Sequence, residues 1–216
     1  MSRDASAARD PNVFPISGHG RQRLLETALR LFDERGIDAT SARAVAMEAG
    51  HRNVGAVAYH FGDLGGLLHE VMVRHQEPVD ARRHHLLDQL EAAGDVQPWA
   101  AIDAMFTPHV ELLADLEGRR FLRVLNQTAN HPTWYPEASP ELWRSVRRGA
   151  RHFLPLWTHL PDDVRIQRAQ MAFGLCSFAL AERARLIDTA QPPRPVLDHK
   201  VFKDDLVTVM ERILGA

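Results

Sequence analysis

The chain has 216 residues, enough to bury a substantial core, and its formal charge of -2 excludes a protein coated in positive charge. A local basic surface is still compatible with that balance, because net charge averages over all faces. The single cysteine, Cys176, excludes internal disulfides and CxxC motifs, so we expect it to be a small core residue in a cytoplasmic protein. No apolar run reaches the roughly 18 residues of a membrane span, and no membrane partner is expected.

The first 50 residues predict an arm followed by two helices. Residues 1–19 mix Ser, Ala, Asp, Pro and Gly without periodicity and lack an apolar secretory segment, which predicts a flexible arm. Apolar residues then recur on one face of a helix over 21–35, which Gly36 closes. In "ATSARAVAMEAG", either Thr40 or Ser41 can cap a second, short helix.

The rest of the chain also reads as helical. After the turn "HRNV", the segment "GAVAYHF" predicts a third short helix. Beyond Asp63 a longer helical pattern runs through Leu90, although Pro78 is expected to kink or break it. Almost nothing alternates with period two, so the predicted fold is all-α. Further helices are expected over 99–116, 119–130, 140–160, 161–189 and 199–214.

The first three helices have the form of a helix-turn-helix, which presents its last helix to the DNA major groove. That groove is about 12 Å wide, so small residues are needed where the helix approaches closely. Gly55, Ala56 and Ala58 supply that clearance. Tyr59 and His60 are then placed to donate hydrogen bonds to phosphate oxygens.

Phe61 is expected to turn inward onto Leu31 and Phe32 and so to hold the third helix in place. An ordinary helix end packed on the next helix is the alternative for these aromatic residues. The candidate DNA-binding residues are Thr40, Ser41, Arg43, Arg52, Asn53, Gly55, Ala56, Tyr59 and His60.

The stretch "LLETALRLFDERGIDATSARAVAMEAG", followed by "AVAYHFGDLGGLL", resembles the N-terminal DNA-binding domain of the TetR family of bacterial transcriptional regulators. The resemblance implies a helix-turn-helix domain over 20–66 and a larger helical domain over 67–216 that binds an effector and dimerises. It also implies a homodimeric repressor, released from a palindromic double-stranded DNA operator by a small apolar effector. No cofactor is implied.

The sequence departs from the family pattern at three places. The turn "HRNV" is one residue longer than usual, and Ala58 stands where many members have a polar or aromatic residue. Leu64 stands where a lysine often contacts a phosphate. Arg52 can replace that contact, because a guanidinium binds a phosphate or a guanine in bidentate fashion. These departures also favour a rival hypothesis, an α-helical interaction module that has lost sequence-specific DNA binding.

By resemblance, some aromatic and polar residues of the larger domain should line an effector cavity, although filling the core is the alternative for most of them. The candidates are Trp99, Met105, Phe106, His109, Phe121, Leu125, Asn126, Gln127, Trp143, Phe153 and Phe173. The last two helices carry apolar stripes that should form a two-fold interface between subunits, with a role in the core as the alternative. The candidates there are Phe178, Leu186, Phe202, Leu206, Val209, Met210 and Ile213.

Catalysis and metal binding have little support. The twelve histidines show neither HExxH nor a Cys/His cluster, and the chain lacks GxSxG, P-loop and dinucleotide motifs. A small all-α enzyme with an Asp/His pair in the larger domain is a rival without a motif. The run of Arg82, Arg83, His84 and His85 is interpreted as a solvated face, because neighbours on a helix point about 100° apart and do not share a ligand.

Overall fold

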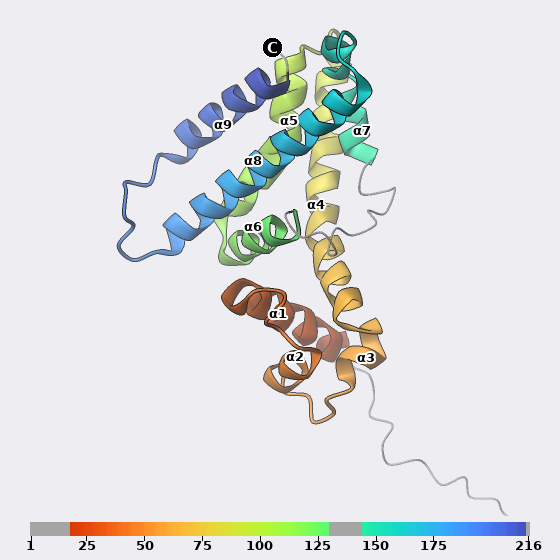
Figure 1. The fold of residues 1–216 in the computed structure, drawn as a ribbon, viewed down its shortest axis with the longest axis vertical. Coiled ribbons are helices and arrows are strands. Elements are labelled where there is room, and N and C mark those ends of the chain that lie inside the picture. The colour runs from red at the N-terminus through yellow and green to blue at the C-terminus, as the bar shows by residue number, and fades with distance from the viewer. Residues whose placement is uncertain (1–17, 130–143, 215–216) are drawn as a thin grey trace, which may run out of the picture.

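The computed structural model describes residues 18–129 and 144–214, and every regular element in those ranges is a helix. Figure 1 shows three short helices at one end and a long helix, α4, that runs from them into the larger part of the molecule. The predicted all-α fold is confirmed. No helix within these ranges is both long and apolar enough to cross a membrane. The predicted arm lies outside the described residues except for its last two, which already belong to α1.

The helix-turn-helix consists of α1 (Gly18–Arg35), α2 (Ala42–Glu48) and α3 (Ala56–Phe61). Of the two possible caps of α2, Ser41 is the one used, since its hydroxyl oxygen accepts a hydrogen bond from Ala44 N at 3.1 Å. Gly36 and Gly50 end the first two helices with φ angles of 88° and 77°, a region that favours glycine.

The long helix α4 spans Leu64–Ala92. Asp63 caps it, with Oδ1 accepting a hydrogen bond from Gly66 N at 2.7 Å. Pro78 lies inside the helix and does not end it, so of the two expected effects, a kink or a break, the break is wrong. One continuous helix therefore joins the helix-turn-helix to the larger domain.

The larger domain contains α5 (Pro98–Glu111), η1 (Leu112–Ala114), α6 (Leu116–Ala129), α7 (Arg144–Ala150), η2 (Leu154–Trp157), α8 (Asp162–Asp188) and α9 (His199–Leu214). The expected ranges of α8 and α9 are confirmed. A single helix over 140–160 is wrong, because the α-helix ends at Ala150 and a separate 3₁₀ turn contains Pro155, which has no N–H to donate. The predicted 99–116 helix also ends early, and Asp115 starts α6 by accepting a hydrogen bond from Gly118 N at 2.8 Å.

Two apolar clusters make up the core. The first combines α1, α2, α3 and the beginning of α4 with Phe121, Val124 and Leu125 of α6. The second combines α5, α8 and α9 with Leu122 of α6. Helix α6 thus contributes residues to both clusters, and the packing is continuous past residue 66, where the helix-turn-helix domain was expected to end.

Candidate nucleic-acid interface

The turn before α3 and the outer face of α3 are exposed. Arg52 and Asn53 lie in the turn, and Ala58 and Tyr59 lie on the helix, with Tyr59 69% exposed. The side chain of Asn53 accepts a hydrogen bond from Gly55 N at 2.8 Å, which shapes the entry into α3. This end of the molecule therefore offers a phenol, an amide and a guanidinium to solvent.

Two of the predicted DNA contacts lie inside the domain. Thr40 is 5% exposed, and its hydroxyl donates to Gly36 O at 2.8 Å and lies 3.3 Å from Leu31 O. Ala56 is 6% exposed and belongs to the first core cluster. Their side chains support α2 and α3 from within, so both are removed from the candidate surface. Ala58 is the small residue that α3 presents to solvent.

The prediction overlooked two exposed apolar residues. Met47 on α2 is 58% exposed, and Val54 in the turn before α3 is 49% exposed. Met47 stands outside the buried stripe formed by Val45, Ala46 and Ala49, so helical periodicity could have identified it. Apolar side chains at this end can contact thymine methyl groups or the partner of an interaction module.

Aromatic packing orients the end of α3. The rings of Tyr59 and His60 meet edge to face with centroids 5.0 Å apart. Phe61 is half-buried against the first core cluster, and the Arg21 guanidinium lies 5.0 Å from the centre of its ring. Burial, with the nearby positive charges of His51 and Arg21, lowers the pKa of His60. The imidazole is therefore neutral at pH 7 and can donate a single N–H.

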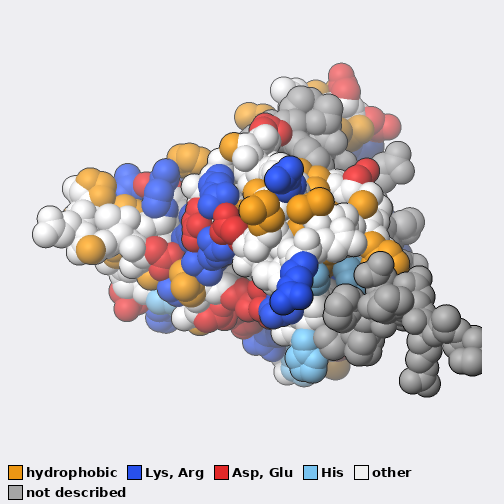
Figure 2. Space-filling model, turned by 90° about the horizontal axis from the view of Figure 1, so that it is seen from below, with side chains coloured by type: hydrophobic (Ala, Val, Ile, Leu, Met, Phe, Trp, Pro, Cys, Tyr) orange, Lys and Arg blue, Asp and Glu red, His pale blue; other side chains and the backbone are white. Residues whose placement is uncertain are grey.

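The charges on this end are partly compensated. Glu48 of α2 accepts hydrogen bonds from Arg30 at 2.7 Å and from Arg35 at 2.6 Å, and these bonds lower the pKa of its carboxyl group. Arg43 and Arg52 are exposed and form no ion pair within the described part of the chain. Figure 2 views the molecule from this end and shows separate groups of basic side chains with acidic, hydrophobic and uncharged surface between them. The candidate interface is mixed rather than strongly basic.

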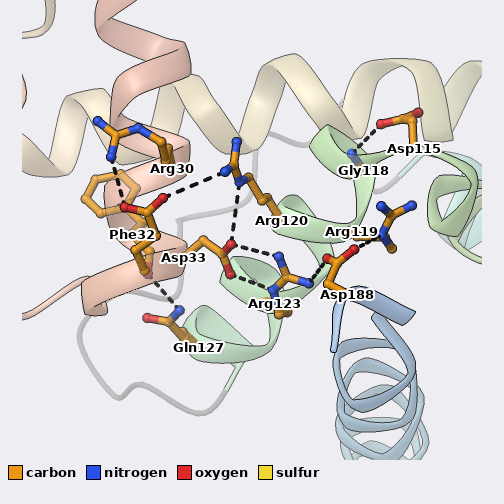
Figure 3. Close-up of polar contacts among 11 residues, drawn as sticks. Arg30, Phe32, Asp33, Asp115, Gly118, Arg119, Arg120, Arg123, Gln127 and Asp188 are labelled. Carbon is orange, nitrogen blue, oxygen red and sulfur yellow. Dashed lines mark hydrogen bonds and ion pairs between the residues drawn. The ribbon is translucent and has the colours of Figure 1, made fainter. Parts of the chain in front are cut away.

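A polar network connects the end of α1 with α6 (Figure 3). Gln127, expected to be a polar group of the effector cavity, instead donates to Phe32 O and accepts from Ile37 N, both at 3.0 Å. Asp33 forms a bidentate ion pair with Arg123, at 2.6 and 2.8 Å. Long polar side chains of α6 thus hold the C-terminal end of α1, and the assignment of Gln127 to the cavity is wrong.

The network extends to α8. Arg123 also donates to Asp188, the last residue of α8, at 2.7 Å, and Arg119 donates to the same carboxylate at 2.7 Å. Arg120 adds weaker ion pairs to Asp33 and Glu34, both at 3.7 Å. The helix-turn-helix, α6 and the end of α8 are therefore joined by charged hydrogen bonds as well as by apolar packing.

The predicted cavity residues do not line one cavity. Phe121 and Leu125 belong to the first core cluster, with Phe173 packed against it, whereas Met105 and Phe153 belong to the second, with Phe106 packed against it. Of the other candidates, Trp99 is 57% exposed, Asn126 is half-buried and Trp143 lies outside the described residues, while His109 is buried. Trp99 therefore lies on the surface, and a role of the buried candidates in an effector cavity stays a prediction.

Arg83 and His109 stand out within the second half of the molecule. Arg83 is 6% exposed and His109 is 4% exposed, and the Arg83 guanidinium donates to His109 Nδ1 at 2.9 Å. The interpretation of the run from Arg82 to His85 as a solvated face is therefore wrong for Arg83, whose side chain points into the core. Among the described residues no group of three or more His, Cys, Asp or Glu side chains is arranged to hold a metal ion.

The predicted subunit interface divides between surface and core. Leu206 and Met210 of α9 belong to the second core cluster, and Leu186 of α8 is 9% exposed, so these three pack within the subunit. Phe202, Val209 and Ile213 are half-buried against the same cluster. Phe178 is 57% exposed, and it continues a stripe with Met171 and Leu175, which are 62% and 40% exposed. That stripe is one apolar surface of α8 available to a partner.

Comparison with known proteins supports the assignment of the N-terminal helices. Residues 24–71 match the model of the bacterial regulatory proteins of the tetR family. No curated protein matches the chain. Several solved structures share the fold over nearly the whole chain. A tetR-family regulatory protein from Rhodococcus RHA1 is 18% identical, with 93% of this chain and 99% of that one covered and a TM-score of 0.56.

Two mycobacterial proteins are similar to the same extent. The ketosteroid transcriptional regulator KstR2 of Mycobacterium tuberculosis is 19% identical, with 89% and 93% of the two chains covered and a TM-score of 0.52. AmtR of Mycobacterium smegmatis is 20% identical, with 96% and 89% covered and a TM-score of 0.52. At these identities the likeness concerns the fold. The family match and the geometry of α1 to α4 together show that this chain carries the helix-turn-helix DNA-binding domain of the TetR family of bacterial regulatory proteins.

Proposed function

We propose that the protein is a homodimeric transcriptional repressor that works in the cytoplasm and binds a near-palindromic operator. The observation that carries this proposal is the exposure of Arg52, Asn53 and Tyr59 on a helix-turn-helix that the family match identifies. Two-fold symmetry of the dimer requires two matching half-sites, one for each α3. The turn residues and Arg43 contact the DNA, while Tyr59 and His60 bind phosphate oxygens.

The stripe of Met171, Leu175 and Phe178 supports a dimer built on α8. Large apolar side chains in a continuous exposed row favour burial against a partner, and a second copy of α8 presents the same row across a two-fold axis. Val201 of α9 is also exposed, at 53%.

A small, largely apolar effector releases the operator in this proposal. The effector occupies the larger domain, and two connections transmit its binding to α3. One is the uninterrupted helix α4, and the other is the network in which Arg123 joins Asp33 of α1 to Asp188 of α8. The protein has two states that differ in the spacing of the two recognition helices. An effector shifts the equilibrium between them only by its differential affinity for the two states, typically about 1 to 3 kcal/mol.

Selection from a random pool of duplex DNA by the purified full-length protein tests the proposal. We expect a motif with two-fold symmetry and an affinity that falls steeply with salt, because phosphate contacts release counterions. The double variant Arg52→Ala/Tyr59→Ala is the matched control, since both side chains are exposed and their removal leaves the core intact. Failure to enrich a symmetric motif, or binding that is independent of salt, overturns the repressor proposal.

An interaction module without sequence-specific DNA binding is the second candidate. The exposed apolar side chains of Met47 and Val54, and the scattered charges of this end, favour it. The same selection separates the two functions, because an interaction module enriches no DNA motif.

A further inference from the structure

Arg83 is a buried cation that forms no ion pair among the described residues, although the charge of Asp80 acts on it from beyond ion-pair distance and raises its pKa against the larger effect of burial. It lies on α4, its Nε donates to Met105 O at 2.9 Å, and its Nη2 donates to His109 Nδ1 at 2.9 Å. Among the described residues no carboxylate lies within ion-pair distance of it. Asp80, one turn earlier on α4, is engaged by the Ser145 hydroxyl and by His84 Nε2 at 3.4 Å. Burying a guanidinium without a paired anion is costly, so this arrangement calls for a function.

His109 adds a second unused donor. Because Nδ1 accepts a hydrogen bond from Arg83, the ring proton of the neutral imidazole sits on Nε2. Burial and the charge of Arg83 lower the pKa of His109 well below its usual value, which keeps the ring neutral. His109 Nε2 is buried and has no hydrogen-bond partner. The pair thus holds one buried imidazole N–H, at His109 Nε2, that has no acceptor, next to the Arg83 guanidinium.

Apart from the charge of Asp80, the surroundings of Arg83 supply apolar contacts. Met105, Cys176 and Trp157 belong to the second core cluster. Burial raises the pKa of the Cys176 thiol to about 12, so this neighbour of Arg83 is not a thiolate. The unpartnered buried side-chain atoms of the described residues all lie in the larger domain, on His109, Trp157, Ser177 and Arg183. The helix-turn-helix has none within its described residues, so the unmet hydrogen-bonding capacity is concentrated where the effector is proposed to bind.

We propose that Arg83 and His109 form a subsite for the head group of a monocarboxylate effector, whose oxygens accept hydrogen bonds from the Arg83 guanidinium and from His109 Nε2. This inference rests on the proposed effector-binding role of the larger domain and specifies the chemistry of the effector. One buried cation matches one negative charge, and a planar carboxylate fits a guanidinium better than a larger, more highly charged phosphate does. The second core cluster receives the apolar body, and Arg83 transmits occupancy to α4, on which it lies.

Binding to the full-length protein tests the subsite without DNA. The probes are decanoate, phenylacetate and cinnamate, each paired with its neutral primary amide, and inorganic phosphate. Thermal shift and titration calorimetry are the readouts. We expect at least one carboxylate to raise the Tm and to bind at least tenfold more tightly than its amide, and phosphate to have no effect. If no carboxylate binds, or if an amide binds as tightly as its acid, the proposal is overturned.

Variants separate a binding role of Arg83 from a structural one. Arg83→Met should abolish the preference for the acid over the amide while leaving the Tm of the free protein unchanged or higher, because a buried uncompensated charge is removed. Arg83→Lys keeps the charge and should retain a reduced preference. Arg82→Met is the control, since Arg82 is exposed and paired with Glu111, and it should bind like the wild type. A preference for the acid that persists at the wild-type level in Arg83→Met overturns the head-group role.

The two proposals fail independently. Carboxylate binding without an enriched DNA motif leaves the subsite standing and removes the repressor. An enriched operator motif with no carboxylate binding removes only the subsite.

Discussion

Asp33, at the end of α1, accepts hydrogen bonds from Arg123 of α6 through both carboxylate oxygens, and Arg123 also donates to Asp188 at the end of α8 (Figure 3). The guanidinium therefore bridges three helices that are distant in the sequence. The side chains of Asp33 and Arg123 are only 10% and 18% exposed, so solvent weakens this pair less than it weakens a surface ion pair.

Arg123→Met should lower the free energy of unfolding by about 1 to 3 kcal/mol, because it leaves the Asp33 carboxylate half-buried without its bidentate partner. Urea denaturation measures the change. Arg119→Met is the matched control, since it removes a bond to Asp188 but leaves the pair with Asp33 intact. An equal drop in the free energy of unfolding in both variants would contradict the claim that the Asp33–Arg123 pair between α1 and α6 stabilises the fold more than the bond to Asp188 does.

Gly66→Ala should destabilise the junction between α3 and α4. A Cβ at this position would lie 2.0 Å from Phe61 O, a backbone atom that cannot move aside without displacing the end of α3. We expect a loss of about 1 to 3 kcal/mol, as for overpacking in a core, and weakened DNA binding. Gly62→Ala would place a side chain at a φ of 82° with open space around its Cβ, whereas Gly66 has no positive φ, so the comparison separates backbone strain from steric clash.

Arg52→Ala should weaken operator binding by one to two orders of magnitude, in line with roughly 1 to 3 kcal/mol for a good contact. A gel-shift titration measures the loss. The melting temperature of the Arg52→Ala variant should match that of the wild type, because Arg52 is exposed. Thr40→Val should do the reverse: it removes buried hydrogen bonds and lowers stability, with DNA affinity changed only through folding. Unchanged affinity in Arg52→Ala removes Arg52 from the interface.

Operator affinity should rise as the pH falls from about 8 toward 6. In the free protein burial lowers the pKa of His60, while a bound phosphate favours the protonated imidazole and raises that pKa. Binding therefore takes up a proton at pH values between the lowered pKa of the free imidazole and the raised pKa of the phosphate-bound imidazole, and the affinity is flat above the bound value. His60→Gln should remove most of the slope. The control is His85→Gln, because His85 is an exposed residue on α4. If operator affinity keeps its dependence on pH in His60→Gln, another group is responsible for the titration.

Phe178→Glu should convert the dimer to a monomer. The substitution places a charge in the exposed stripe of α8 that the proposed interface buries, whereas Phe178 contributes little to the subunit's own core. Sedimentation velocity measures the change in mass, and affinity for a two-fold operator should fall in parallel. Leu116→Glu is the control, because Leu116 is 46% exposed on α6, outside the stripe. A dimer that survives Phe178→Glu places the interface elsewhere.

Local sequence patterns determined the helices. Apolar periodicity and the glycines at 36 and 50 predicted α1 and α2, and the same periodicity predicted α8 and α9 within a residue at each end. These features depend on contacts within a few turns of chain, so residue type and spacing carry them. The short third helix, which ends in Tyr59, His60 and Phe61, was predicted for the same reason.

The tertiary structure decided what covers each helical face. Thr40 and Ala56 are small residues of types that are also common on protein surfaces, yet neighbouring helices bury both of them. Arg83 has the charge of a solvated residue, but α5 supplies a carbonyl and an imidazole that hold it inside the core. Gln127 and Arg123 reach partners about 90 positions away, at Ile37 and Asp33. Periodicity identifies an inward face, whereas the partner on that face depends on how distant helices pack, and that packing sets which polar groups are left unpaired.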